Sequence, residues 1–488
     1  MTYIDQAILE AHSFRQTQTA LTSYWMMRDG FRLAYETPVV GYPWSIPYEF
    51  PIYQWVVAVI AQAAGTSLTD TGRSVSFLFL LASLIPAAMI VRRLGLPWRV
   101  WFAFSALFLS SPLYLFWGRT FMIETTATCL MLFALAYGLD VVRRSASWTT
   151  VALAFVWSTL ALLQKVTTAL PIIALLMAAW LIVGLARAEP RQSFAWREWL
   201  KVSMAWGLSL VIGAGWSTYS DRIRVHNAVA VFSSSSYPLN VLLWNFGSPD
   251  QRVSTALWMD VVFFRGLFLN AGAGLGAVLI GAALGWRTRN RTRWIVAGAL
   301  AAYSAALLVF TNLHIVHDYY QVACTVFLIA AVAVAIGEWL PSAVPSRFAW
   351  VAVLLAVVSI NLYQFSRYDL SLMQKVLSAK TNRTLAIASE IDRLVPVGTP
   401  ILVYGFEWSS EVAYYAQRKS FTVPEFFPRI LETLTEPEKF LGGVKPGAVV
   451  ACPGGKASPE LVDLTLASRD QYTRIDLHDC RILVRRQP

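Results

Sequence analysis

The sequence is poor in charged residues and in cysteine. Only 14% of its 488 residues are Asp, Glu, Lys or Arg, whereas soluble proteins average about 25%. This shortage excludes an ordinary soluble domain. The four cysteines form no CxxC pair and no His/Cys spacing of the kind that binds metals. The chain also begins with polar residues, so its start does not have the pattern of a cleavable signal peptide.

Apolar and aromatic residues are abundant instead. Hydrophobic residues make up 56% of the chain, and the mean hydropathy is +0.51. The 20 Trp, 19 Tyr and 27 Phe suit the aromatic belts at membrane–water interfaces. These features predict a polytopic α-helical membrane protein in contact with lipids. The net charge of +11 does not indicate nucleic acid, because most basic residues lie in short loops between apolar runs.

Apolar runs long enough to cross a bilayer follow one another through the middle of the chain. A membrane helix needs about 20 predominantly apolar residues, and we expect about 10–11 such helices here. In the region 149–186, Lys165 and Pro171 mark either a turn or a kink. The predicted spans are 74–91, 99–117, 121–141, 149–165, 167–186, 202–218, 266–286, 294–311, 320–340 and 348–365.

Alternate loops between these runs are basic, which predicts the orientation of the chain. By the positive-inside rule the basic loops are cytoplasmic, so the other loops and both ends of the chain should lie on the outer face. An outer N-terminus without a signal sequence is hard to export, and we therefore expect a membrane helix upstream of residue 1. The alternative is that the short polar region is translocated unaided. The basic loops carry Arg92, Arg93 and Arg99; Arg143 and Arg144; Arg187, Arg191, Arg197 and Lys201; Arg287, Arg289, Arg291 and Arg293; and Arg347.

Residues 1–50 form the only long polar region ahead of the apolar runs. Charged groups beside a bilayer are costly unless they face water or a substrate, so we interpret this region as a catalytic lid on the outer face. Within it, residues 5–29 predict an amphipathic helix that lies on the membrane. Residues 51–65 are too short to span with confidence and predict a second interfacial or re-entrant helix. The transmembrane module then extends over 51–366.

Residues 367–488 have the composition of a small extracytoplasmic α/β domain. A helix at 383–394, a strand at 400–404, a helix at 411–417 and strands at 448–452 and 480–484 alternate in the expected way. Cys452 and Cys480 would either pair across neighbouring strands, in a compartment that permits disulfides, or remain two buried thiols.

Three residues of the lid are candidates for chemistry. Glu49 lies just ahead of the first apolar stretch, where a carboxylate can act as general base on a hydroxyl acceptor. Arg15 can bind a phosphate through two nitrogens. His12 lies three residues before Arg15 and would share its helix face, as a second catalytic group. The alternative for each is a solvated or headgroup-contacting side chain.

Further candidates lie at the predicted outer ends of the spans. Glu124 stands within apolar sequence, and acids inside a membrane are functional candidates by default. Arg119 and Lys165 would bind a donor phosphate, although Lys165 could simply extend its amine to the membrane surface. His317, with Asp318 and Tyr320 beside it, concentrates polar groups at another membrane edge.

Together these positions suggest cations that hold a leaving phosphate and a carboxylate that deprotonates the attacking hydroxyl. We expect the lid and the span ends to converge on one water-accessible pocket. The predicted roles are as follows: catalytic, Glu49 and His12; binding the donor phosphate, Arg15, Arg119, Lys165 and His317; binding substrate, Gln16, Glu124, Asp318 and Tyr320.

Four short motifs, in this order and between these spans, resemble bacterial membrane glycosyltransferases of the GT-C superfamily. The branch that the chain is most similar to includes protein O-mannosyltransferases and the aminoarabinose transferase of lipid A. The resemblance covers roughly residues 5–365. The motifs are His12-Ser13-Phe14-Arg15-Gln16-Thr17-Gln18-Thr19-Ala20, Glu49-Phe50-Pro51-Ile52-Tyr53, Gly118-Arg119-Thr120-Phe121-Met122 and His317-Asp318-Tyr319-Tyr320.

The resemblance implies a bacterial enzyme of the cytoplasmic membrane that transfers a sugar from a polyprenyl-phosphate donor to a lipid, glycan or protein acceptor. It also implies a catalytic acid in the first outer loop and, in some members, a divalent metal. Many members have an acidic residue early in that loop, where this chain has Gln18. This departure shifts the predicted base to Glu49.

Two other readings stay open. A transporter or flippase of a lipid-linked sugar would use the same cations for binding, but such proteins often show two related halves with broken helices at the midplane. No such repeat is visible, and the polar residues gather at one predicted face. The missing early acid also allows a non-catalytic relative that only binds such substrates.

Overall fold

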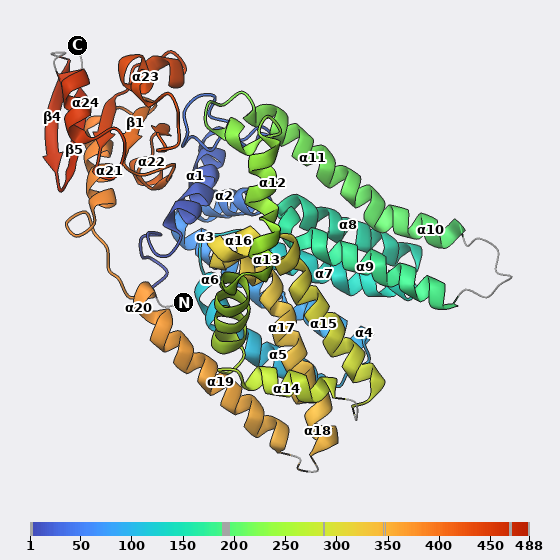
Figure 1. The fold of residues 1–488 in the computed structure, drawn as a ribbon. Coiled ribbons are helices and arrows are strands. Elements are labelled where there is room, and N and C mark those ends of the chain that lie inside the picture. Colours follow the sequence, from blue (N-terminus) through green and yellow to red (C-terminus); the bar gives the residue numbers. More distant parts are fainter. Residues whose placement is uncertain are drawn as a thin grey trace. The chain divides into compact units, whose positions relative to one another are not determined.

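The protein is described from a computed structural model of the chain (Figure 1), which describes residues 3–187, 196–285, 288–344, 346, 348–467 and 471–486. The chain folds into two compact units. Unit 1 comprises Met1–Arg73, Ser217–Val241 and Gln374–Pro488, and unit 2 comprises Ser74–Trp216 and Leu242–Met373. Compactness therefore groups the predicted lid with the C-terminal domain. The basic residues Arg191, Arg287 and Arg347 lie outside the described residues.

Helices make up most of unit 2 and are also numerous in unit 1. In the first half they are α1 (Ser13–Asp29), α2 (Ile52–Ala64), α3 (Leu68–Ala82), α4 (Leu84–Arg93), α5 (Trp98–Ser110), α6 (Pro112–Trp117), α7 (Glu124–Val142), α8 (Trp148–Gln164), α9 (Val166–Arg187), α10 (Trp196–Val202), η1 (Ser203–Gly207), α11 (Leu208–Arg224), η2 (Ala230–Ser233) and α12 (Pro238–Phe246). In the second half they are α13 (Pro249–Val253), η3 (Ala256–Phe268), α14 (Leu275–Leu284), α15 (Asn290–Val309), α16 (Thr311–Val316), η4 (Asp318–Gln321), α17 (Val322–Val334), η5 (Ala335–Trp339), α18 (Leu340–Ala343), α19 (Ala349–Tyr368), α20 (Leu370–Met373), α21 (Arg383–Leu394), α22 (Glu411–Ala416), α23 (Ile430–Thr435), η6 (Pro437–Phe440), α24 (Pro459–Val462) and η7 (Asp463–Ala467).

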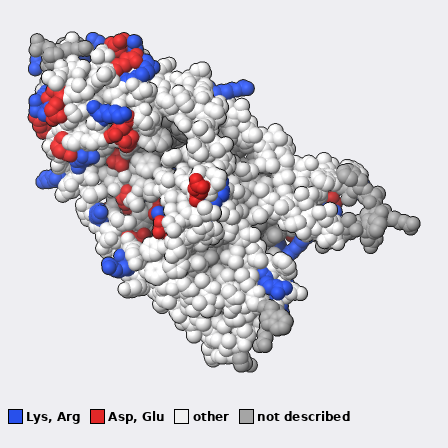
Figure 2. All heavy atoms as spheres, in the orientation of Figure 1, with Lys and Arg blue, Asp and Glu red and all other residues white. Residues whose placement is uncertain are grey.

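Among the described residues, six helical segments are long and apolar enough to cross a membrane. They correspond to six of the predicted spans and confirm a polytopic α-helical membrane protein with a small C-terminal α/β domain. In Figure 2 the visible helix faces carry few charged side chains, whereas such side chains cover much of the C-terminal domain. The six segments are Leu68–Arg93, Glu124–Val142, Val166–Ala186, Asn290–Val309, Asp318–Ala343 and Ala349–Tyr368.

The other four predicted spans are shorter or interrupted in the structure. The prediction at 99–117 breaks at Ser111, which has an extended backbone ahead of Pro112 at the start of α6. The prediction at 149–165 gives α8, with 17 residues. The prediction at 202–218 joins η1 to part of α11, and 266–286 contains the 10-residue helix α14 after a π-helical segment. Apolar composition did not locate these breaks.

The region 149–186 forms two helices joined by a turn. Lys165 has an extended backbone (φ −162°, ψ 100°) and ends α8, whereas Pro171 lies inside α9. The two helices contact each other, as Figure 1 also shows. The turn therefore places the Lys165 side chain between the end of one helix and the start of the next.

Helix α1 differs from the predicted amphipathic helix. It begins at Ser13 rather than residue 5, and ten of its residues are buried, most of them polar. It packs against α2 and α22 within unit 1. The hydroxyls of Thr17, Thr19 and Thr22 each donate to the carbonyl four residues earlier, at 2.7 to 3.1 Å. Because a hydroxyl bonded to its own helix can be buried at little cost, this polar helix is accommodated in an interior.

The C-terminal domain contains one five-stranded sheet in the order β2-β1-β3-β5-β4. Strand β1 pairs in parallel with β2 and β3, and β5 pairs antiparallel with β3 and β4. Helix α21 matches the predicted 383–394, and its N-cap Asn382 accepts from the backbone of Leu385. The strands are β1 (Ile401–Tyr404), β2 (Ser420–Thr422), β3 (Ala448–Ala451), β4 (Tyr472–Leu477) and β5 (Cys480–Arg485).

Successive residues of β1 pack on opposite faces of this sheet, as the pleat requires. Ile401 and Val403 pack with α21, whereas Leu402 packs with residues of the N-terminal region, including Val39 and Val40. Val40 also forms an isolated antiparallel bridge with Phe421 of β2. Distant parts of the chain thus share one core, which explains the composition of unit 1.

Cys452 and Cys480 form a disulfide. They follow β3 and begin β5, two neighbouring antiparallel strands. Of the two alternatives from the sequence, the structure has the paired one. The other two cysteines, Cys129 and Cys324, are buried free thiols, as expected.

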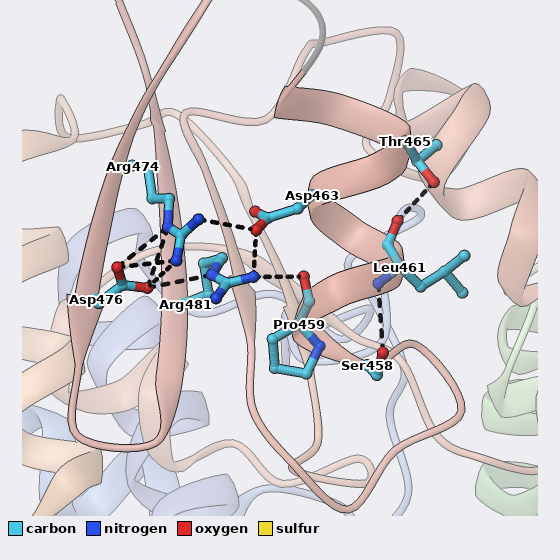
Figure 3. A network of polar contacts seen from close by, with 8 residues as sticks. All are labelled: Ser458, Pro459, Leu461, Asp463, Thr465, Arg474, Asp476 and Arg481. Carbon is cyan, nitrogen blue, oxygen red and sulfur yellow. Dashed lines mark hydrogen bonds and ion pairs between the residues drawn. The ribbon is translucent and has the colours of Figure 1, made fainter.

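An ion-pair network joins the β4–β5 hairpin to the helical segment before it (Figure 3). Arg474 and Arg481 both pair with Asp463 of η7 and with Asp476 of β4. Arg481 also donates to the carbonyl of Pro459 at 3.2 Å. The two cations and two anions balance, so we interpret the network as structural.

Arg73 anchors the N-terminal segment in unit 1. Its fully buried guanidinium donates to the carbonyls of Tyr3, Ile4 and Gln6. It also pairs with Glu10 at 2.8 Å, where the side chains are 0% and 3% exposed.

We expect Arg73→Met to lower the free energy of unfolding by about 3–5 kcal/mol, because Glu10 would remain a buried charge without its partner. Thermal unfolding in detergent measures the change. Arg32→Met is the matched control, because Arg32 is exposed and its side chain has no hydrogen bond or ion pair with the described residues. Equal melting temperatures for the two variants would contradict this role.

Candidate functional site

The ten predicted site residues fall into two groups, one in each unit. His12, Arg15, Gln16 and Glu49 belong to unit 1, and the other six belong to unit 2. The convergence expected from the sequence stays a prediction.

Glu49 and Arg15 form an ion pair in unit 1. The side chain of each is 17% exposed. Arg15 donates through its other terminal nitrogen to Oε1 of Gln18 at 2.7 Å. One guanidinium therefore holds both the Glu49 carboxylate and the side chain at position 18. Arg15, predicted as a phosphate ligand, is in the structure a partner of the predicted base.

Two further residues, Tyr35 and Arg224, hold the segment that carries Glu49, and the sequence did not single them out for this. The buried Tyr35 hydroxyl donates to the backbone carbonyl of Glu49 at 2.8 Å and accepts from the backbone of Tyr48 at 2.9 Å. Burial first, and then the charge of Glu49, raise the pKa of Tyr35 far above its ordinary value. Tyr35 therefore stays a neutral donor. Arg224 bonds the Pro47 carbonyl and lies 4.7 Å from the Tyr48 ring centroid.

His12 is not in the helix with Arg15, contrary to the expected shared face. It is the N-cap of α1, in a left-handed conformation with φ 49°. Its carbonyl accepts from the backbone N–H groups of Arg15 and Gln16, and its ring packs edge-on against Phe14 at 5.9 Å. Gln16 is fully buried and donates to the Ala11 carbonyl at 3.0 Å. Both residues are thus seen in local contacts at the start of the helix.

Lys165 and Glu124 form a buried ion pair in unit 2. Their side chains are 6% and 1% exposed. Glu124 begins α7 and Lys165 occupies the α8–α9 turn, so two residues predicted separately are brought together. The Lys165 amine also lies 3.9 Å from the ring centroid of Tyr320 and 5.6 Å from that of Tyr319. Aromatic faces attract a desolvated cation. Unlike a carboxylate, the two tyrosine rings do not neutralise the positive charge of Lys165.

The His317 segment supplies an aromatic surface beside this lysine. The His317 ring stacks on Tyr319 with centroids 5.1 Å apart, and Tyr319 stacks on Tyr320 at 4.9 Å. Trp244 approaches His317 edge-on at 5.9 Å. Asp318 lies within the same turn, at the start of η4. The segment therefore places the Tyr320 ring beside the Lys165 amine, and His317 and Asp318 are its neighbours in the chain.

Arg119 lies in the connection between α6 and α7, five residues before Glu124. It is 6% exposed, and its guanidinium lies 5.9 Å from the ring centroid of Phe116. A buried arginine that retains its charge keeps its ability to bind an anion.

Solved structures of other proteins resemble this fold. The sequence matches no protein-family model and no curated protein. A structure of ArnT from Cupriavidus metallidurans bound to undecaprenyl phosphate aligns over 99% of this chain and 95% of that one, with a TM-score of 0.63 and 16% identity. The chain has the GT-C fold.

Two other structures of this fold agree. The arabinofuranosyltransferase AftD from Mycobacteria aligns over 96% of this chain and 39% of that one, with a TM-score of 0.54 and 13% identity. The apo oligosaccharyltransferase of Archaeoglobus fulgidus aligns over 97% of this chain and 71% of that one, with a TM-score of 0.50 and 12% identity. These identities show the fold alone, and the GT-C resemblance of the sequence is confirmed at that level.

His314 is a residue of this GT-C fold that the prediction did not assign to the site. It is buried in α16, and its ring centroid lies 6.2 Å from that of Tyr320. Burial first, and then the charge of Lys165, lower the pKa of His314 to about 3. The imidazole is therefore neutral at physiological pH, which leaves the positive charge on the lysine.

Further buried polar side chains lie close in the chain to Glu124, Lys165 and Tyr320. Gln321 is 1% exposed, and neither oxygen nor nitrogen of its amide finds a partner among the described residues. The same holds for the hydroxyls of Thr125, Thr168 and Thr325. Buried polar atoms are normally hydrogen-bonded, so this part of unit 2 is suited to a ligand that carries hydroxyl groups.

The described residues contain no group of three or more His, Cys, Asp or Glu side chains that could hold a metal ion. The divalent metal that the resemblance allows thus has no evident ligand set there. We derive no step through a metal.

The stability of unit 2 should depend on pH through the carboxyl group of Asp369. Burial first, and then the charge of Asp318, raise the pKa of Asp369 to about 7 from 3.8. The folded state therefore keeps this proton where the unfolded chain releases it, and stability falls as pH rises between these two values.

We expect Asp369→Asn to unfold at a higher temperature than the unchanged protein at pH 8. The difference should shrink towards pH 4, because both proteins are then uncharged at this position. Thermal unfolding in detergent at several pH values measures this. A difference that stays constant with pH would contradict the assignment.

Proposed function

We propose that the protein transfers a sugar from a polyprenyl-phosphate donor to an acceptor hydroxyl at the outer face of the bacterial cytoplasmic membrane. The observation that carries this proposal is the match over 99% of the chain to a GT-C structure bound to undecaprenyl phosphate. Because a fold alone does not define an activity, the proposal also requires residues with suitable chemistry. The acceptor would be a lipid, a glycan or a protein.

The proposed reaction is a single displacement that inverts the sugar. The acceptor oxygen attacks the anomeric carbon, and the bond from that carbon to the phosphate oxygen breaks. Polyprenyl phosphate leaves with the bonding electrons, and the hydroxyl proton passes to the Glu49 carboxylate. Arg15 fixes this carboxylate, and His12 would assist the transfer of the proton.

The donor phosphate is assigned to Lys165, with Arg119, His317 and Arg15 as further contacts. Lys165 supports this role because it is a buried cation held by Glu124 and two aromatic rings. A fixed charge in a water-poor site stabilises a developing negative charge strongly. The neutral His314 beside it would not compete for the phosphate.

The sugar is assigned to the polar residues around this lysine. Glu124, Asp318, Tyr320 and Gln16 keep their predicted role in binding substrate. The buried amide of Gln321 and its neighbouring threonine hydroxyls are suited to the hydroxyl groups of a sugar.

An outer-face location is supported by the disulfide between Cys452 and Cys480. Disulfides persist mainly outside the cytosol. The basic loops of the sequence favour the same orientation.

The test uses purified protein in sealed proteoliposomes that carry a synthetic polyprenyl-phosphate sugar. We expect free polyprenyl phosphate and glycosylated acceptor to form together. Movement of intact donor across the bilayer without either product would favour a transporter or flippase. Donor binding without transfer or movement would favour a non-catalytic relative.

A further inference from the structure

A second polar site lies in unit 2 among residues that have no role in the proposed transfer. It is a cavity of about 400 Å³ lined by the first residues of α5, the residues that begin α15, and the η5–α18 segment. The polar groups that matter for its chemistry are Arg99, Arg289, Thr292, Glu338 and Ser342. None of them belongs to the predicted site.

Two arginines give this cavity its positive charge. Arg99 donates through Nε to the Gly337 carbonyl, and among the described residues no other bond of its guanidinium is found. Arg289 has no hydrogen bond or ion pair with the described residues. Glu338 likewise pairs with neither arginine, although it lines the same cavity. The charges are therefore held around the cavity rather than neutralised within it.

A threonine also lines this space. Thr292 is 3% exposed as a residue and contributes to the cavity wall. Its hydroxyl can donate a hydrogen bond to an acceptor oxygen of a ligand there.

Two helix N-termini add to the preference for an anion. Helix α5 has 13 residues and begins after Pro97, and α15 has 20 residues and begins after Arg289. Pro97 and Arg289 both line the cavity. The unpaired N–H groups and the dipole of a helix start favour negative charge.

The helix ends also place the cavity at the level of lipid headgroups. Helix α15 is a candidate membrane span, and the span Asp318–Ala343 ends in the segment that lines the cavity. Trp98 is the first residue of α5 and Trp294 the fifth of α15, and they are 56% and 70% exposed. Exposed tryptophans at span ends are typical of the membrane–water interface.

We propose that this cavity binds the phosphodiester of a phospholipid headgroup. Arg99 and Arg289 contact the phosphate oxygens, and the hydroxyls of Thr292 and Ser342 donate to them. Glu338 accepts from a hydrogen-bond donor in the part of the headgroup beyond the phosphate. Basic pockets between membrane helices bind lipid headgroups in this way. The site would stabilise the basic side of unit 2 and is independent of sugar transfer.

The test measures lipid binding to the full-length protein by native mass spectrometry, after delipidation in detergent. Dioleoyl phosphatidylglycerol is the probe. We expect Arg289→Gln to weaken binding about tenfold, through the loss of a charged hydrogen bond. Arg92→Gln is the control, because Arg92 is an exposed arginine in the last turn of α4 and does not line the cavity. It should bind like the unchanged protein.

Two additional measurements make the outcome decisive. Thr292→Val changes no charge, and we expect it to weaken binding about threefold, through loss of one hydrogen bond. Glycerol 3-phosphate tests a soluble source of the same chemistry, and binding of this ester without the lipid would overturn the lipid as ligand. Equal losses in Arg289→Gln and Arg92→Gln, or no loss in either, would overturn the site.

Discussion

Replacement of Glu49 by Gln is expected to lower the turnover number for sugar transfer by about 10²–10⁴-fold. This is the usual contribution of a general base. The variant keeps the size of the side chain and its hydrogen-bonding oxygen, so the Arg15 contact can persist while the proton acceptor is lost. The Michaelis constant for the donor should change little, because the base acts on the acceptor. Steady-state transfer with a labelled donor measures both quantities.

The contacts of Arg15 allow a second test of the catalytic role of Glu49. Because Arg15 bonds both Glu49 and Gln18, a carboxylate at either position would lie beside the same guanidinium. We therefore expect Gln18→Asp to restore part of the activity lost in Glu49→Gln. A merely structural role of Glu49 would not produce this rescue, since the second substitution adds a further change.

Glu36→Gln is the matched control for Glu49→Gln. Glu36 lies in the same N-terminal region and also forms an ion pair, with Lys419, but it has no proposed role in transfer. We expect its turnover to stay within about twofold of the unchanged protein, since loss of a partly exposed ion pair costs little. Full activity in Glu49→Gln would remove Glu49 from the catalytic role.

Replacement of Lys165 by Met is expected to reduce kcat/KM for the donor by about 10²–10³-fold, through the loss of one charged contact to the leaving phosphate. The same variant should also be less stable by about 3–5 kcal/mol, because Glu124 would remain buried without a partner. Loss of activity in this variant alone therefore does not separate binding from folding.

The double variant Lys165→Met/Glu124→Gln separates the two effects. It removes both charges, so its melting temperature should return towards that of the unchanged protein. Its transfer activity should stay low, because the phosphate still lacks its cation. Recovery of both stability and activity would show that the lysine serves only to neutralise Glu124.

The sequence predicted regular elements best where local pattern and burial agree. Helix α21 and strands β1, β3 and β5 lie close to their predicted ranges, because each has a cap or a short apolar run. Strand β4 was missed because three of its six residues, Thr473, Arg474 and Asp476, are polar and exposed. Helix α1 was placed on the membrane because the sequence could not show that it packs against α22, almost 400 residues later.

The candidate residues were recognised individually, but their partners were not. An acid in apolar sequence drew attention to Glu124, and a lysine at a predicted turn to Lys165, yet their pairing joins residues 41 apart. Arg224 and Tyr35 stand in no motif, so only the fold reveals that they support the Glu49 segment. His314 stands three residues before the His317 motif, but its burial and neutrality are properties of the packed helices.

The account depends most on one event, the cleavage of the donor's sugar–phosphate bond as the acceptor is glycosylated. The most direct measurement follows a donor labelled in both the sugar and the lipid, incubated with purified protein and acceptor. The account predicts that free polyprenyl phosphate and glycosylated acceptor appear in a one-to-one ratio, and that both are lost in Glu49→Gln. Donor that stays intact in the presence of folded protein and a panel of acceptors would contradict it.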